Sequence, residues 1–342
     1  MRRRSIAFVA SGNWSFVQRD REILEKTFLV RDVQWRGKRS ILPLALAVLR
    51  SDLTFSWFAL DHAYAACRLA RTLGKRSIVV VGGVDAANRA DLQYGVHLNA
   101  KMGPRSRYAL AHSDIVLVVD DFLRDEITRN TGISRPEIRT IHSGFDTSWF
   151  QPDGGPKTSV LTVGAVDDTN VERKGLRVFV ETARLVPELP FVLVGGRPNA
   201  ATRRLRSIAP PNLRIADWLS DTELLEEFRR ARVYVQASQY EGLPNALGEA
   251  MACECVPVGT SVAGIPTLMG DTGYFVPVND PVATADAIRE AYVQGDRARA
   301  RQRIVEHFPV KRRQDAIDEV TTALLENVRK WSLRRRRTAT KF

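Results

Sequence analysis

Two carboxylates frame a turn and the start of a helix in the stretch SQYEGLPNALGEAMACE, which runs from residue 238 to 254. Glu241 and Glu249 are separated by seven residues, and a Gly-Leu-Pro-Asn turn lies between them. A helix beginning near Pro244 would expose the unpaired N–H groups of its first turn, and these groups favour an anion. Carboxylates at pH 7 only accept hydrogen bonds, so beside an anion they would accept from hydroxyls. A nucleotide sugar offers both phosphates and hydroxyls.

A pair of cations forms a second candidate anion site. Arg173 and Lys174 precede Gly175 in VERKGL, a loop that follows the strand-like run VLTVGAV. Two adjacent cations suit a diphosphate. An ordinary surface pair is the competing interpretation, but the position after a predicted parallel strand favours ligand binding.

The elements that must position these residues alternate along the whole chain. Short runs rich in Val and Ile alternate with helical patterns, which is typical of parallel sheets covered by helices. The alternation breaks in HSGFDTSWFQPDGGPKTS, where Gly, Asp and Pro cluster. We therefore expect an α/β chain with two doubly wound domains, at residues 1–152 and 153–309, followed by a helix and basic tail at 310–342. A ligand site is expected in the cleft between the two domains.

The formal net charge of +12 is concentrated at the two ends. Ten terminal cations leave about +2 for the rest of the chain, which argues against a specific nucleic-acid groove through the body. Such tails either touch an anionic membrane surface or are solvated. The ten cations are Arg2, Arg3, Arg4, Arg329, Lys330, Arg334, Arg335, Arg336, Arg337 and Lys341.

Other classes of protein lack their usual signals here. No apolar run approaches the roughly 18 residues of a membrane span. No G-x-G-x-x-G follows the first strand, where Gly12 stands alone, so the usual dinucleotide fingerprint is missing. The three cysteines and the histidines show no metal-ligand spacing, and we expect neither a metal nor a cofactor. The apolar run SILPLALAVLRS after Arg36, Lys38 and Arg39 predicts a helix that lies either in a core or at a membrane interface.

The second half of the chain resembles the family 4 retaining glycosyltransferases, the glycosyl transferases group 1, which have the two-domain GT-B fold. The resemblance rests on E-GLPNALG-E followed by AMACECVPVGTSVAGIP, on RKG at residues 173–175, and on the linker-like HSGFDTSWFQP. It implies two Rossmann-like domains facing a central cleft, with a C-terminal helix that returns to the N-terminal domain.

The resemblance also implies roles for individual residues. Lys174 and Arg173 would hold the diphosphate, Glu241 would contact the donor sugar, and Glu249 would bind the ribose hydroxyls. The remaining donor-binding residues would be Gly242, Leu243, Pro244 and Asn245 in the turn, with Gly12 and Asn13 in the loop after the first strand.

Three positions depart from the family pattern. Gly164 is followed by Ala165, where many relatives have an arginine. Asp85 stands where many relatives have a histidine that touches the transferred sugar. Glu254 occupies a position that is usually glycine, so a turn is expected to be disturbed. His62 and His97, at predicted loop or strand ends, are further candidate sugar or acceptor contacts, with buried structural histidines as the alternative.

We therefore expect a metal-independent glycosyltransferase that moves a sugar from a nucleotide-sugar donor to an acceptor hydroxyl with retention. The acceptor would be a lipid-linked molecule or a glycan, and the enzyme would be cytoplasmic, on the inner face of the membrane through its basic ends. The alternatives are a sugar-nucleotide epimerase on the same fold and a non-catalytic binding protein. Incubation with donor alone distinguishes the epimerase.

Overall fold

The computed structural model describes residues 3–338, with the side chains of the C-terminal helix described through Glu326. The chain divides into two compact units, which are described separately. Unit 1 comprises residues 1–89, 95–142 and 311–342, and unit 2 comprises residues 90–94 and 143–310. Apart from residues 90–94, the chain passes from unit 1 into unit 2 at 142/143, ten residues before the expected boundary. The predicted binding of the basic ends to an anionic membrane surface depends largely on Arg2 and on the cations from Arg329 onward, which lie outside the described residues or side chains.

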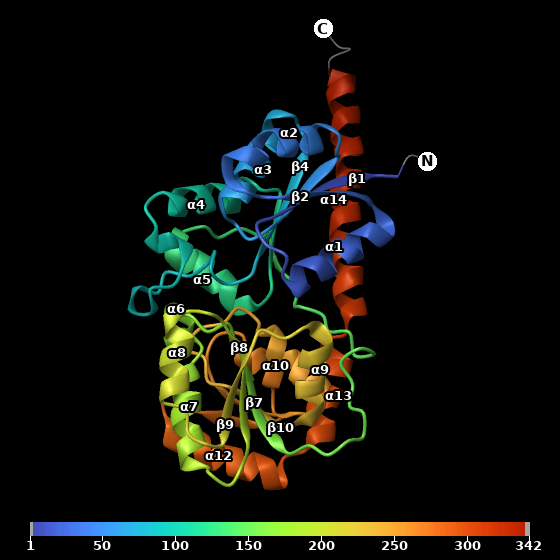
Figure 1. Cartoon of the computed structure of the whole chain (residues 1–342). Helices are drawn as coiled ribbons and strands as arrows, with labels where there is room; N and C mark the ends of the chain where they lie inside the picture. The colour runs from blue at the N-terminus through green and yellow to red at the C-terminus, as the bar shows by residue number, and fades with distance from the viewer. Residues whose placement is uncertain (1–2, 339–342) are drawn as a thin grey trace. The chain divides into compact units, whose positions relative to one another are not determined.

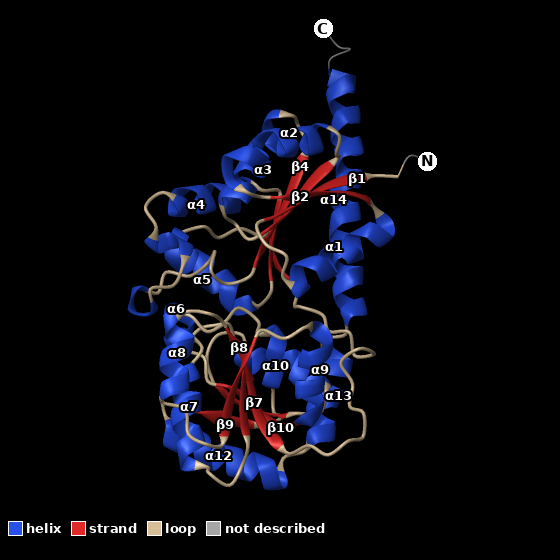
Figure 2. Ribbon diagram, in the orientation of Figure 1, coloured by secondary structure: helices blue, strands red, loops and turns tan. Residues whose placement is uncertain are grey.

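Unit 1 is built on a six-stranded parallel sheet in the order β2-β1-β3-β4-β5-β6. Figure 2 shows its strands surrounded by helices. The order reverses beside β1, as in other doubly wound sheets. The strands are β1 (Ser5–Ala10), β2 (Leu29–Gln34), β3 (Leu53–Trp57), β4 (Arg76–Val81), β5 (Ile115–Val118) and β6 (Ile138–Thr140). The helices are α1 (Ser15–Thr27), α2 (Ile41–Leu49), α3 (Asp61–Thr72), α4 (Met102–His112), α5 (Asp121–Thr131) and α14 (Val310–Thr338), with short 3-10 turns η1 (Gly37–Ser40) and η3 (Val96–Leu98).

Unit 2 has a second six-stranded parallel sheet, in the order β12-β11-β10-β7-β8-β9. This order reverses between β7 and β10, which is the Rossmann arrangement. The strands are β7 (Ser159–Val163), β8 (Phe191–Gly196), β9 (Leu213–Asp217), β10 (Ala231–Gln236), β11 (Val256–Thr260) and β12 (Tyr274–Val276). The helices are α6 (Asp168–Arg173), α7 (Leu176–Leu185), α8 (Ala200–Ser207), α9 (Asp221–Arg230), α10 (Asn245–Ala252), α11 (Ile265–Met269), α12 (Pro281–Gln294) and α13 (Arg297–His307), and the 3-10 turn η2 (Ala90–Leu92) also clusters with this unit.

Continuous apolar strands form the cores because helices cover the sheets. Every residue of β1, β3, β8 and β11 is buried. The predicted capping box is present at the start of α9, where Ser220 and Glu223 exchange side-chain and backbone hydrogen bonds. Both doubly wound domains expected from the alternating pattern are therefore confirmed.

The C-terminal helix α14 returns to the N-terminal unit, as the resemblance implied. A bidentate ion pair fixes it there: Arg313 Nε and Nη2 each lie 2.6 Å from an oxygen of Asp20. Both side chains are buried, at 3% and 0% exposure. Trp57 Nε1 also donates to Asp20 over 2.8 Å, and Arg313 Nη1 donates to the carbonyls of Ile141 and His142. Every charge in this cluster is thus matched by a hydrogen-bond partner.

Candidate functional site

The candidate site lies where the strand order of unit 2 reverses. The carboxyl ends of β7 and β10 are neighbours in the sheet, and open α/β sheets bind ligands outside such a pair of strand ends. The strand β7 leads into Gly164, and β10 leads into Ser238. The acid of 241 lies in the loop after β10, whereas the cation pair of 173–174 lies at the end of α6, the short helix that follows β7, and not in a loop as expected.

Glu241 is the centre of the polar cluster. Its Oε1 accepts from Lys174 Nζ over 2.8 Å, from Ser238 Oγ over 3.1 Å and from Gln236 Nε2 over 3.3 Å. Its Oε2 lies 3.4 Å from Arg173 Nη1. Burial would raise the pKa of the Glu241 carboxyl, but the charges of Lys174 and Arg173 outweigh it and lower the pKa to about 2. Glu241 is therefore a carboxylate at any physiological pH.

The two cations differ in what surrounds them. The Arg173 guanidinium is buried: it donates to the Tyr240 carbonyl over 2.9 Å and to Asn170 Oδ1 over 2.6 Å. It also lies 4.5 Å from the ring centroid of Tyr94, a favourable cation–π arrangement. The Lys174 side chain is 20% exposed and is held mainly by Glu241. Lys174 is consequently the cation of this pair that a ligand reaches more easily.

Two glycines allow the backbone to pack tightly under these side chains. A Cβ at Gly164 would come within 2.8 Å of Lys174 Cδ, so the lysine stem lies directly over this residue. Gly175 has a φ of +63°, and a Cβ there would lie 2.2 Å from the Ala237 carbonyl oxygen. The start of α7 thus rests against the end of β10, which holds Lys174 next to Glu241.

The predicted helix after the turn is α10, with Pro244 as its N-cap residue. Glu249 lies in its second turn and is buried. Leu243 and Pro244 are buried, whereas Asn245 at the first helical position is half-buried. A Cβ at Gly248 would lie 2.2 Å from the Phe145 ring, which explains the glycine inside this short helix. The expected geometry, a helix start between two acids, is therefore present.

The other candidate residues belong to unit 1. Gly12 and Asn13 line a hollow of about 400 Å³ at the carboxyl ends of β1 and β2. The remaining lining residues are Ser11, Asp32, Gln34, Trp35 and Arg36. This hollow combines an aromatic ring with amide, carboxylate and guanidinium groups, a set of partners that suits a polar small molecule.

Asp85 and His62 are engaged by the backbone of unit 1. Asp85 is fully buried and accepts from the N–H groups of Ala59, Gly82 and Gly83. Burial raises its pKa to about 6 despite these bonds. His62 Nε2 donates to the Trp57 carbonyl over 2.5 Å, and burial lowers the pKa of this imidazole to about 4. Both side chains are therefore hydrogen-bonded to backbone groups of unit 1.

His97 lies in η3 and is half-buried. Among the described residues neither of its ring nitrogens has a hydrogen-bond partner. Burial and the nearby positive charge of Arg107 lower its pKa, so the imidazole is neutral at pH 7. Of the three candidates for sugar or acceptor contacts, His97 is the one whose ring makes only a weak contact with the protein, to the backbone of Asp85.

Sequence reasoning missed several members of the cluster around Glu241. Gln236 and Ser238 hydrogen-bond to each other over 2.7 Å as well as to the acid. Thr260 Oγ1 donates to the Ser238 carbonyl over 2.6 Å and so fixes the end of β10. Polar residues at the end of a buried apolar strand, as in RVYVQAS, could have indicated that Gln236 and Ser238 belong to the site. Tyr94 had no such signal, because it comes from a distant loop whose residues 90–94 cluster with unit 2.

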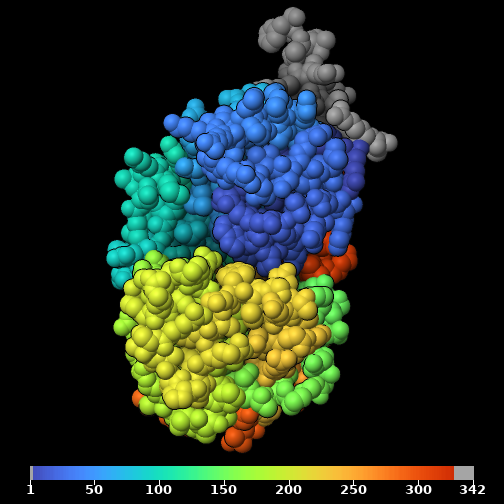
Figure 3. Space-filling view, viewed as in Figure 1, coloured from blue at the N-terminus to red at the C-terminus, as the bar shows by residue number. Residues whose placement is uncertain are grey.

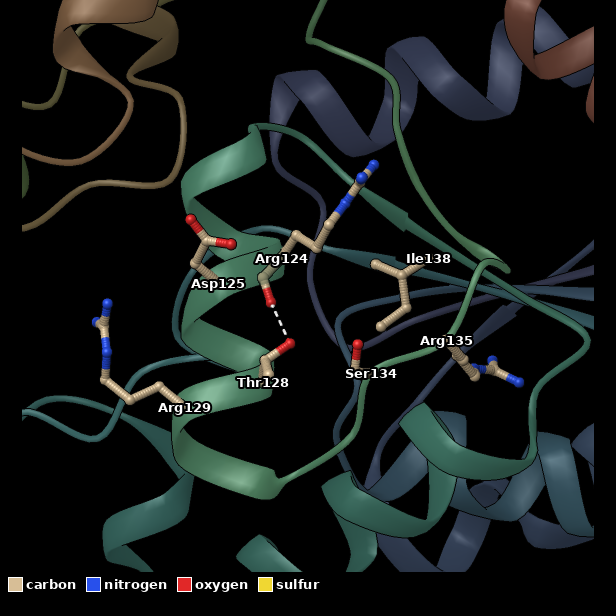
Figure 4. Close-up of a pocket in the computed structure, with 7 residues that line it drawn as sticks. All are labelled: Arg124, Asp125, Thr128, Arg129, Ser134, Arg135 and Ile138. Atoms are coloured by element: carbon tan, nitrogen blue, oxygen red, sulfur yellow. Dashed lines mark hydrogen bonds between the residues drawn. The ribbon is translucent and has the colours of Figure 1, made fainter.

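A second hollow, of about 410 Å³, lies beside α5 in unit 1 and is lined by arginines (Figure 4). In Figure 4 the guanidinium groups of Arg129 and Arg135 point to opposite sides of it. Arg129 pairs with Glu126, and Arg135 Nη2 donates to the Ser113 carbonyl over 2.7 Å. The cations do not converge on the hollow, so it does not form an anion site.

Among residues 3–326, whose side chains the structure describes, no group of three or more His, Cys, Asp or Glu side chains is placed to hold a metal ion. No helix in this part of the chain is long and apolar enough to cross a membrane.

Comparison with known structures defines the class of fold. Sucrose-phosphate synthase from Thermosynechococcus elongatus superimposes with a TM-score of 0.75 over 95% of this chain and 100% of that structure, at 16% identity. HepE of Anabaena in complex with UDP-glucose gives a TM-score of 0.74 over 93% and 99%, at 13% identity. The fold is therefore GT-B, as expected from the sequence.

A family model matches part of unit 2. Residues 157–294 match the family model described as glycosyl transferases group 1, and this segment contains Lys174, Glu241 and Glu249. The resemblance inferred from the motifs is thereby confirmed.

Curated relatives match parts of this chain at less than 30% identity. Alpha-maltose-1-phosphate synthase of Mycolicibacterium smegmatis is 29% identical over 59% of this chain and 61% of its own length. N-acetyl-alpha-D-glucosaminyl L-malate synthase of Bacillus anthracis is 26% identical over 75% and 71%. The chain thus spans less than two thirds of the first of these relatives.

Proposed function

We propose that this chain is a glycosyltransferase that moves a sugar from a nucleotide-sugar donor to an acceptor hydroxyl with retention of the anomeric configuration. The observation that carries the proposal is the ion pair between Lys174 and Glu241 beside the start of α10, at the strand-order reversal of unit 2. A cation, a carboxylate and a helix N-terminus together offer partners for the diphosphate and for sugar hydroxyls.

Lys174 would bind the diphosphate of the donor. Its ammonium has three donors, and in the absence of donor it is held by a single carboxylate oxygen of Glu241. Turning toward the diphosphate keeps that contact within reach, because the flexible four-carbon stem has room above Gly164. The N–H groups at the start of α10 would bind the same anion.

Arg173 would position Glu241 rather than contact the donor. Its guanidinium is fixed by the Tyr240 carbonyl, Asn170 and the ring of Tyr94, so moving it would break several interactions. Glu241, oriented by Arg173 and Ser238, would accept from hydroxyls of the transferred sugar. Glu249, buried in the second turn of α10, would accept from the ribose hydroxyls.

The reaction would proceed at the anomeric carbon of the donor. The bond from this carbon to the phosphate oxygen breaks, and its electron pair stays on the diphosphate. The acceptor oxygen bonds to the same face of the sugar, and its proton passes to the diphosphate. Charge on the leaving group grows in the transition state, so Lys174 and the start of α10 would contribute most to the rate.

The donor and acceptor classes are also part of the proposal. Structures of the similar HepE contain UDP and UDP-glucose, which supports a nucleotide sugar as the donor here. The acceptor would be a lipid-linked molecule or a glycan, and no specific nucleic acid would bind. We place the enzyme in the cytoplasm, on the inner face of the membrane, with its basic ends at the anionic surface.

A donor screen followed by product analysis tests this function. A nucleotide sugar at 100 times its Kd should stabilise the protein by about 2.7 kcal/mol in a thermal-shift experiment. The donor so found should be consumed only when an acceptor is present, in the presence of EDTA, and NMR of the product should show the donor's anomeric configuration. Conversion of the donor alone into an isomeric nucleotide sugar would instead identify an epimerase, and loss of turnover in EDTA would contradict metal independence.

A further inference from the structure

Helix α2 (Ile41–Leu49) presents an apolar face to solvent. Its exposed side chains are Leu42 at 69%, Leu49 at 55%, Ile41 at 53% and Leu46 at 44% of their full exposure. Figure 1 shows the helix beside α3 in unit 1, and the medium-blue atoms of this region form part of the surface in Figure 3. Single exposed apolar residues are ordinary, but four large ones on a nine-residue helix mark an interaction surface.

The opposite face of the helix holds it firmly to unit 1. Leu44, Ala47 and Val48 are buried in a core cluster that includes residues of β1 and β2. The C-terminal carbonyls of α2 are also occupied, because Lys75 Nζ lies 2.6 Å from the carbonyl oxygens of Val48 and Leu49. The outer face is therefore presented by a well-packed helix.

Exposed cations flank both ends of this apolar face. Arg36, Lys38 and Arg39 precede the helix, and Arg50 follows it directly; all four are exposed. Within the described part of the chain, none of these four side chains forms an ion pair. Ser40 joins the two regions, since its Oγ accepts from the Arg36 N–H over 2.7 Å and donates to the Gln34 carbonyl over 3.2 Å.

We propose that the outer face of α2 docks on an anionic lipid bilayer. The helix lies along the surface, with its leucines in the boundary between headgroups and acyl chains and its flanking cations among anionic headgroups. The four exposed cations favour a bilayer over a second copy of this chain as the partner of this face. A second copy would bring four like charges against these four, whereas an anionic bilayer neutralises them.

This docking would also bring the hollow lined by Gly12 and Asn13 close to the bilayer. Arg36 and Gln34 line that hollow, and Ser40, at the start of α2, is hydrogen-bonded to both. A bilayer under α2 brings headgroups to the rim of a polar hollow of about 400 Å³. Resting on the proposed glycosyl transfer, this favours an acceptor anchored in the membrane.

Vesicle binding by the full chain tests the proposal. Phosphatidylcholine vesicles are compared with vesicles of equal parts phosphatidylcholine and phosphatidylglycerol, and binding is measured by flotation. The double variant Leu42→Gln/Leu46→Gln should bind the anionic vesicles about tenfold more weakly. Lys38→Gln/Arg39→Gln should lower binding by a similar factor and reduce its dependence on salt.

Matched controls separate this surface from other causes. Val282 and Val293 on α12 are similarly exposed, at 59% and 75%, so Val282→Gln/Val293→Gln should leave vesicle binding unchanged. Deleting residues 333–342 measures how much the C-terminal tail contributes to vesicle binding. Binding that disappears with the tail but is unaffected by both α2 variants would overturn the proposal, as would a concentration-dependent dimer that the Leu42→Gln/Leu46→Gln variant abolishes. Since donor binding in solution should be unaffected in these variants, failure of the docking and failure of the proposed reaction are distinguishable.

Discussion

Lys174 Nζ lies 2.8 Å from Glu241 Oε1, and this contact joins the two motifs that the sequence presents 67 residues apart. The loop before α7 carries the cation and the loop after β10 carries the acid. Because β7 and β10 are adjacent, parallel and separated by the strand-order reversal, their following loops meet at one edge of the sheet. The proposed reaction depends on this one juxtaposition.

Removing either member of this pair should mainly lower kcat. Glu241→Ala and Lys174→Ala each lose an interaction with a charged group, worth roughly 1.5–3 kcal/mol, so kcat should fall about 10- to 150-fold. Because the residues contact each other, the double variant should lose less than the product of the two factors. Steady-state kinetics with the donor identified by the screen measures this. Arg177→Ala, on the exposed pair with Glu172, serves as the control and should be indistinguishable from the unaltered protein.

The low pKa of Glu241 should appear in the acid stability of the protein. Its folded-state pKa of about 2 lies below the ordinary value of 4.5, so the ionised form stabilises the folded state above about pH 5. This contribution, of the order of 3 kcal/mol, is lost as the pH falls from about 5 to about 2. The difference in unfolding free energy between the unaltered protein and Glu241→Gln should therefore shrink over this range. A difference that stays constant from pH 7 to pH 3 would contradict the assigned pairing.

Glu254 shows how a departure from the family pattern is accommodated. The turn is kept rather than lost: Glu254 adopts a φ of +65° and its N–H donates to the Met251 carbonyl. This conformation costs residues other than glycine roughly 1–2 kcal/mol. Glu254→Gly should consequently raise the unfolding free energy by about 1 kcal/mol in urea denaturation. Glu254→Ala keeps the Cβ and is the control: a gain of equal size in this variant would show that the charge, and not the backbone, is responsible.

The Arg313–Asp20 pair should be essential for attaching α14 to unit 1. Arg313→Ala leaves the Asp20 carboxylate buried without its bidentate partner, and such losses cost about 3–5 kcal/mol. Lys311→Ala removes an exposed ion pair with Asp315 one turn away and should cost less than about 1 kcal/mol. Calorimetric unfolding of both variants compares them; equal effects would mean that the buried pair contributes no more than a surface contact.

Much of this architecture could be predicted from local pattern. Helix α9 begins at the predicted residue because Ser220 and Glu223 specify its cap, and the long apolar strands specify the parallel sheets. The relation of Arg173 to its surroundings could not be predicted, because Tyr94 and Tyr240 approach it from other parts of the chain. Asp85 was a candidate by position alone, and the three N–H groups that it accepts from depend on how the loop after β4 folds.

The central claim is that the acid before α10 and the acid within it have different partners: Glu241 binds the transferred sugar and Glu249 binds the ribose. Calorimetric titration with the free nucleoside diphosphate, which has ribose but no sugar, tests it most directly. Glu249→Ala should weaken binding by about 10- to 150-fold, whereas Glu241→Ala should leave the Kd nearly unchanged. Equal losses in both variants, or a loss in Glu241→Ala alone, would contradict the assignment of the two acids.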